Sequence, residues 1–258
     1  MARVREAAGG GRVVEVEPER LRGWFVRFGE RHGGLATADP TVDPGADPAA
    51  DAPADPAVPA PGARSGEPPG PVAGGRRSPV VRVTAGDGAT AEVAVPFGGL
   101  PAVCGDPEAV LDALAAHVAA PRRIGIVLVR LGGHSVGVAV GDAVEASTTG
   151  ARPVHGRNRK GGSSSGRFAR RRDNQARVAL DAAADAVARF LLPVADTLDA
   201  VVLGGDAAAL DALRADRRLA ALLARAEPRV LDVPEPRRAV LDEAARRARA
   251  VEITLREG

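Results

Sequence analysis

The sequence is poor in aromatic and sulfur-containing residues. Phe, Trp and Tyr together make up 2% of the 258 residues, and Cys104 is the only cysteine. A core must therefore be built from Ala, Val and Leu, and both a disulfide framework and a cysteine-based zinc site are excluded. The four histidines lie too far apart for a local metal motif. We accordingly expect neither a metal nor an organic cofactor.

Long apolar runs are also missing. The longest covers about residues 124–129, far short of the roughly 20 residues that span a bilayer. The first thirty residues contain no uninterrupted apolar segment of the kind found in secretory signals. We therefore expect a soluble, cytoplasmic protein.

Residues 37–79 differ in composition from the rest of the chain. They hold 11 of the 21 prolines, repeated Asp-Pro steps and no aromatic residue. Such a segment buries too little apolar surface to offset its loss of conformational entropy, which predicts a disordered linker. It would separate residues 1–36 from a domain at residues 80–258.

The segment 1–36 contains one amphipathic pattern. The large apolar side chains follow the i, i+3, i+4, i+7 spacing of one helical face, in the order Leu21, Trp24, Phe25 and Phe28. A strand-like stretch at 13–16 precedes them. A piece this short is not stable alone, so we expect it to dock on the core, with Trp24 as a packing anchor.

The pattern becomes regular after the linker. A hairpin is predicted around residues 86–88, and a helix at 107–118 with Asp106 as its N-cap. From residue 123 the predicted order is three strands, a helix, and then alternating strands and helices, at 124–130, 135–140, 143–148, 167–192, 200–203, 207–214, 217–225, 229–233 and 236–250. This βββ-α-β-α-β-α order predicts a mixed α/β protein with a ribonuclease-H-like core and an N-terminal helix and hairpin extension.

Positive charge is concentrated in one window. Residues 152–172 contain no Asp or Glu and eight basic residues, namely Arg152, Arg157, Arg159, Lys160, Arg167, Arg170, Arg171 and Arg172. The net charge of the whole chain is +2, so the remainder carries 2 − 8 = −6. Positive charges at a helix N-terminus oppose the helix dipole, whereas a polyanion stabilises them through counterion release. The window predicts a nucleic-acid contact, with His155 as a further candidate for phosphate or base.

A loop predicted at 150–166 overlaps this window, and its part inside the window includes the sequence Gly161-Gly162-Ser163-Ser164-Ser165-Gly166. Its glycines permit close approach to a ligand, and its backbone N–H groups can stabilise an oxyanion. A Walker A loop requires a lysine that is absent here. A serine hydrolase requires a preceding strand and a later histidine, and no histidine follows His155. We favour a flexible tip delivered to an RNA-lined site.

The strand order also raises the possibility of a nuclease. Two-metal hydrolysis requires clustered carboxylates. The first predicted strand has none, and Glu145 and Asp206 stand alone in the sequence. Asp206 is more simply a helix cap, so a nuclease is disfavoured.

The stretch from His155 to Gln175, HGRNRKGGSSSGRFARRRDNQ, resembles the actinobacterial Vms-like release factors. These are peptidyl-tRNA hydrolases related to the middle domain of the eukaryotic class I release factor. The resemblance extends over the whole chain except the linker. It implies ribosome rescue: the loop enters the peptidyl-transferase centre of the large ribosomal subunit, and water is positioned against the peptidyl-tRNA ester.

The resemblance also implies roles for individual residues. Residues 161–165 would form the catalytic loop. Ribosomal RNA or tRNA would contact the basic residues and His155, and the protein is expected to be a monomer. The glutamine usual in such loops is missing, because Ser164, Ser165 and Gly166 stand there. A non-catalytic factor that binds the ribosome or tRNA is therefore the alternative.

Overall fold

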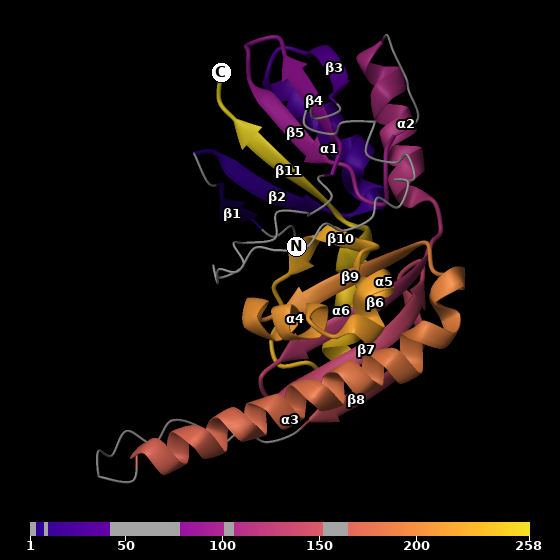
Figure 1. Cartoon of the computed structure of the whole chain (residues 1–258). Helices are drawn as coiled ribbons and strands as arrows, with labels where there is room; N and C mark the ends of the chain where they lie inside the picture. The colour runs from indigo at the N-terminus through magenta and orange to yellow at the C-terminus, as the bar shows by residue number, and fades with distance from the viewer. Residues whose placement is uncertain (1–3, 8–9, 42–77, 101–105, 152–164) are drawn as a thin grey trace, which may run out of the picture.

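The computed structural model describes residues 4–7, 10–41, 78–100, 106–151 and 165–258, and for residues 165–173 it describes the backbone alone. The strands form two sheets, one in the upper half of Figure 1 and the other in the lower half. The six-stranded sheet has the order β1-β2-β11-β5-β4-β3, and every neighbouring pair in it is antiparallel. Its strands are β1 (Val4–Glu6), β2 (Arg12–Val16), β3 (Leu35–Thr41), β4 (Val80–Ala85), β5 (Thr90–Ala94) and β11 (Val251–Arg256).

The five-stranded sheet is mixed. Its order is β10-β9-β6-β7-β8, with β6 parallel to β9, β9 parallel to β10, and β7 antiparallel to both β6 and β8. Its strands are β6 (Arg123–Arg130), β7 (Gly133–Val140), β8 (Ala143–Ala151), β9 (Ala200–Gly205) and β10 (Ala226–Leu231). The mixed α/β class predicted from the sequence is confirmed.

Helices cover both faces of the five-stranded sheet. On one face, Val127 and Val129 of β6 pack against α3 (Ser165–Leu191) and α4 (Ala207–Arg214). On the other face, Ile126 and Leu128 pack against α6 (Arg238–Arg249). A strand buried on both faces is an unbroken apolar run, which explains the run in β6.

The six-stranded sheet has one helix-covered face. Strands β4 and β5 alternate buried and more exposed residues, and the buried ones join α1 (Pro18–Arg31) and α2 (Pro107–Ala119) in a single core. Leu21, Phe25 and Phe28 of α1 lie in this core, as the helical spacing predicts. Trp24 packs against the core but is only partly buried.

The predicted elements from residue 123 onward occur in the predicted order, with small shifts at their ends. The predicted helix at 217–225 is a 3-10 turn at Arg217–Leu219 followed by α5 (Ala220–Leu223). Asp106 occupies the N-cap position of α2 as predicted, but its side chain makes no capping hydrogen bond. Strand β11 was not predicted at all. It pairs with β2 on one side and β5 on the other, so the end of the chain joins the sheet formed by its beginning.

The predicted linker begins later than residue 37, because β3 continues to Thr41. Pro40 is compatible with this strand since β3 lies at the sheet edge, where a missing N–H is tolerated. Residues 42–77 lie outside the described part of the chain. The predicted hairpin is β4–β5, and it pairs with β3 and β11. Strands from both sides of the predicted linker, β1 to β3 before it and β4 and β5 after it, thus belong to the same sheet.

Candidate functional site

The longest helix, α3, carries the start of the site predicted from the sequence. It has 27 residues, which corresponds to about 40 Å at the rise of an α-helix. In Figure 1 its C-terminal part lies along the five-stranded sheet, while its N-terminal part extends beyond the edge of the molecule.

Burial along α3 agrees with this picture. None of residues 174–178 is buried, whereas Ala179, Ala183, Val187 and Leu191 are. Leu191 and Val187 are completely buried in the core between α3 and the sheet. Ala179 is the first buried residue among those of α3 whose side chains are described, and it lies about 21 Å along the helix axis from Ser165.

The structure describes only part of the predicted site. Ser165 is the first residue of α3, and the backbones of Arg167, Arg170, Arg171 and Arg172 lie in its first turns. The other predicted residues lie outside the described part of the chain, namely His155, Arg157, Arg159, Lys160, Gly161, Gly162, Ser163 and Ser164. The predicted helix start at Arg167 is therefore two residues late.

Strand β8, which precedes the predicted loop, makes a close cross-strand contact with β7. Gly150 of β8 lies opposite His134 of β7. A Cβ atom on Gly150 would lie 2.5 Å from Cε1 of the His134 ring, so a larger residue does not fit without moving the ring. His134 is part of β7, and its ring lies against Gly150 of the neighbouring strand, which ends at Ala151.

Two charged groups lie at the carboxyl ends of the neighbouring parallel strands. Arg130 ends β6, and its Nη2 atom is 2.9 Å from Oδ1 of Asp206, the residue that follows β9. Its Nη1 atom donates to the carbonyl oxygen of Val233 at 2.6 Å. Asp206 occupies the N-cap position of α4, but its side chain makes no capping hydrogen bond. The carboxylate instead binds the guanidinium, a pairing that the sequence does not reveal.

No metal centre appears in the part of the chain that the structure describes, where no three His, Cys, Asp or Glu side chains form a possible metal-binding group. Glu145 pairs with Arg123 at 2.8 Å, between Arg123 Nη1 and Glu145 Oε2. The two carboxylates considered in the sequence analysis are therefore both paired with arginine, Glu145 with Arg123 and Asp206 with Arg130. Within the same residues no helix is both long and apolar enough to cross a bilayer.

Comparison with known proteins relates the chain to translation. The model of a family described as actinobacteria and chloroflexi VLRF1 release factor matches residues 122–254, which is half of the chain. No curated protein matches the chain. A crystal structure of the archaeal translation termination factor aRF1 is similar at 16% identity and a TM-score of 0.37, over 64% of this chain.

The likeness to the archaeal factor covers 48% of that protein, so the chain spans about half of its length. A TM-score this low does not establish a shared fold. The family match stands on its own, since it covers the five-stranded sheet, α3, α6 and the first four residues of β11. The chain belongs to the VLRF1 release factors of actinobacteria and chloroflexi.

Proposed function

We propose that this protein is a release-factor-like peptidyl-tRNA hydrolase that frees nascent chains on stalled large ribosomal subunits. Membership of a release-factor family supports a role in translation. The observation that carries the proposal is the protruding N-terminal half of α3, which begins at Ser165, within the Gly-Gly-Ser sequence. No metal or organic cofactor is part of the proposal.

The protruding helix suits a polyanionic target. Eight basic residues and no acidic residue lie between 152 and 172. Four of the eight belong to the first turns of α3, the part of the helix that extends beyond the sheet. Negative phosphates would stabilise these charges where the helix dipole does not. We therefore assign RNA binding to Arg157, Arg159, Lys160, Arg167, Arg170, Arg171, Arg172 and His155, with large-subunit RNA and peptidyl-tRNA as partners.

The proposed reaction is hydrolysis of the ester between the peptide and the tRNA. The oxygen of a water molecule attacks the carbonyl carbon, the ester C–O bond breaks, and a proton passes to the leaving 3′ oxygen of the tRNA. Backbone N–H groups at Gly161 and Gly162 would stabilise the developing oxyanion. The hydroxyls of Ser163, Ser164 and Ser165 would orient the water, and ribosomal RNA would complete the site.

We further propose that the five-stranded sheet and its helices form a ribonuclease-H-like core. The strand order β8-β7-β6-β9-β10 and the parallel β6–β9–β10 pairing support this. Because helices bury both of its faces, this sheet would hold the C-terminal part of α3 in a fixed position. We also expect the protein to act as a monomer in the cytoplasm, where ribosomes work.

A second candidate function is favoured by one observation. The loop has Ser164, Ser165 and Gly166 where related loops carry glutamine. Without that side chain the protein could bind the ribosome or tRNA and leave the ester intact. The two functions share the binding surface and differ only in chemistry.

A peptide-release assay separates the two functions. Purified full-length protein is added to stalled large subunits that carry labelled peptidyl-tRNA, and both free peptide and co-sedimentation are measured. A hydrolase releases peptide, and the Gly161→Ala/Gly162→Ala variant loses release while it still co-sediments. Co-sedimentation without release identifies a binding factor. A Ser165→Gln variant that gains release would show that the missing glutamine limits the chemistry.

A further inference from the structure

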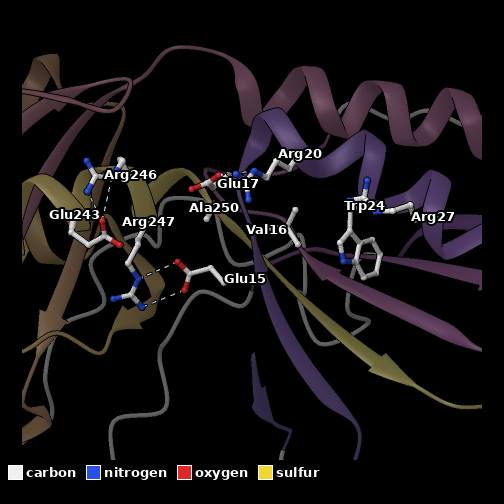
Figure 2. A pocket seen from close by; sticks show the side chains of 10 residues that line it. All are labelled: Glu15, Val16, Glu17, Arg20, Trp24, Arg27, Glu243, Arg246, Arg247 and Ala250. Carbon is white, nitrogen blue, oxygen red and sulfur yellow. Dashed lines mark hydrogen bonds and ion pairs between the residues drawn. The ribbon is translucent and has the colours of Figure 1, made fainter. Parts of the chain in front are cut away.

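A groove lies between α1, which packs on the six-stranded sheet, and the C-terminal end of α6. Its cavity volume is about 150 Å³. Figure 2 shows the side chains that line it, which come from β2, α1, α6 and the residues beside them, namely Glu15, Val16, Glu17, Arg20, Trp24, Arg27, Glu243, Arg246, Arg247 and Ala250. The groove is separate from the protruding helix α3, which lies at the far side of the other sheet in Figure 1.

Trp24 is the aromatic residue that lines this groove. Its indole is stacked on Phe28 with the ring centroids 5.5 Å apart and the planes 9° apart. Phe25 meets it edge-on at 4.9 Å. Phe28 therefore covers one face of the indole, and a ligand in the groove that Trp24 lines would stack on the opposite face. A flat ring placed there would extend the stack that Phe28 and Trp24 begin.

Arg27 adds a positive charge to the groove. Arg20, Trp24 and Arg27 lie at i, i+4 and i+7 of α1, which is one stripe of the helix. Arg27 is exposed, and among the described residues no carboxylate pairs with it. This charge is therefore available to a phosphate.

The acidic residues of the groove are already neutralised. The Glu17 Oε2 atom is 3.2 Å from Arg20 Nε, and Glu243 Oε2 is 2.5 Å from Arg246 Nη2. Glu15 is paired twice, with Arg247 Nε at 3.0 Å and with Arg229 Nη2 at 2.7 Å. The hydrogen bond from Arg246 to Glu243 raises the pKa of Arg246. Arg27 is then the uncompensated charge of the groove.

We infer that this groove binds a nucleotide, with the base stacked on Trp24 and the phosphate on the guanidinium of Arg27. Base stacking on an aromatic side chain tolerates any base, because every base has a π face. A guanidinium binds phosphate through parallel N–H donors. The nucleotide could be free in solution or part of an RNA strand, and both carry the same base and phosphate. The inference does not depend on the proposed hydrolase function.

The composition of the chain supplies a direct probe. Trp24 is the only tryptophan and the protein has no tyrosine, so indole emission from the full-length protein reports this groove alone. The probes are the free ribonucleoside monophosphates, the matching nucleosides, ribose 5-phosphate and a short single-stranded RNA. We expect saturable quenching by the monophosphates, quenching by nucleosides only at higher concentrations, and none by ribose 5-phosphate.

Arg27→Gln tests the phosphate contact. We expect it to weaken nucleotide binding about tenfold, the size of a charge-assisted contact, and to leave nucleoside binding unchanged. Arg31→Gln is the matched control, since Arg31 is exposed on the same helix but does not line the groove. Trp24→Leu, followed by calorimetry with a thermal melt as a check on folding, should weaken binding at least about fivefold.

Several results would overturn the inference. Absence of quenching by every nucleotide and by RNA would do so, as would equal quenching by ribose 5-phosphate or equal loss of affinity in Arg31→Gln. Tighter binding of RNA than of monophosphates assigns the groove to an RNA strand, and the reverse assigns it to a free nucleotide. A variant with Arg170, Arg171 and Arg172 changed to Gln should keep the mononucleotide signal even if ribosome binding is lost, which separates this site from the proposed function.

Discussion

Strand β6 of the five-stranded sheet is buried at every residue from Ile124 to Val129, whereas β11 of the six-stranded sheet alternates buried and partly exposed residues. The difference follows from the helices, which cover both faces of the first sheet and gather on one face of the second. A sheet enclosed on both faces resists distortion and suits the anchoring of a long protruding helix. A sheet covered on one face keeps polar residues for ion pairs and for a groove.

The largest expected effect comes from placing a charge on adjacent strand residues. In β6, Val127→Asp and Leu128→Asp should each lower the free energy of unfolding by about 3–5 kcal/mol, because both bury an unpaired carboxylate. In β11, Ile253→Asp should cost as much, but Thr254→Asp less than about 1 kcal/mol, since Thr254 is only partly buried. Chemical denaturation of the four variants measures the contrast. Equal tolerance at Leu128 and Thr254 would contradict it.

The next effect concerns the ion pairs that join the two sheets. Glu15 of β2 holds Arg229 of β10 and Arg247 of α6, and its side chain is 13% exposed. Burial lowers the pKa of Arg229, and the negative charges of Glu252 and Glu15 oppose this shift. Glu15→Ala should cost about 3 kcal/mol and separate the unfolding of the two sheets into distinct transitions.

The control for Glu15 is an exposed pair. Glu108 accepts from Arg22 at 3.1 Å, with a side chain 54% exposed. Glu108→Ala should cost less than about 1 kcal/mol and leave a single transition in a calorimetric scan. If both variants unfold alike, the buried network does not couple the sheets.

A smaller effect distinguishes crowded from open glycines. Gly205 has a φ of +119°, and a Cβ atom there would lie 1.8 Å from the carbonyl oxygen of Val129. Gly34 has a φ of +93° with no atom within 4 Å of the Cβ position. Gly205→Ala should cost about 3 kcal/mol and Gly34→Ala about 1 kcal/mol, because only the first adds a clash to the backbone strain. Thermal melts compare them, and a reversed order would be evidence against this packing.

The smallest effect is a pH dependence. The backbone N–H of Ala89 and the side chain of His32 lower the pKa of Asp87 below its usual 3.8. The carboxylate thus stabilises the fold fully above that value and loses its contribution as the pH falls through the lower folded pKa. The difference in Tm between the wild type and Asp87→Asn should therefore shrink in acid.

Asp216 provides the counterpart in the other half of the molecule. Bonds from the side chain and backbone of Arg218 lower the pKa of Asp216, so Asp216→Asn should show the same trend. A Tm difference that grows in acid for either variant would contradict the assigned contacts.

The sequence predicts the elements that are defined by local patterns. The apolar spacing of α1 and the unbroken run of β6 were readable because each pattern lies within a few residues. Strand β11 was missed although Val251 and Ile253 alternate with polar residues, because its partners lie more than 150 residues away. The strand at Leu35–Thr41 was hidden by its Asp-Pro composition.

The loop site and the Trp24 groove also differ in how far apart in the sequence their residues lie. The basic window and the Gly-Gly-Ser loop are local features that the sequence displays directly. The groove at Trp24 brings together α1 and α6, whose residues are separated by more than 200 positions. Trp24 was interpreted as a packing residue, and it does pack, but only the folded chain shows that it also lines a groove.

The most direct test of the account is to find what the tip of the loop touches. A photoreactive amino acid replaces Ser163, and a matched variant carries it at Asp181, an exposed position on the anchored part of α3. Both are irradiated on stalled large subunits that carry peptidyl-tRNA. The account predicts cross-links from position 163 to the 3′ end of the peptidyl-tRNA or to RNA of the peptidyl-transferase centre, and none there from position 181. Cross-links from position 163 that avoid this centre would contradict it.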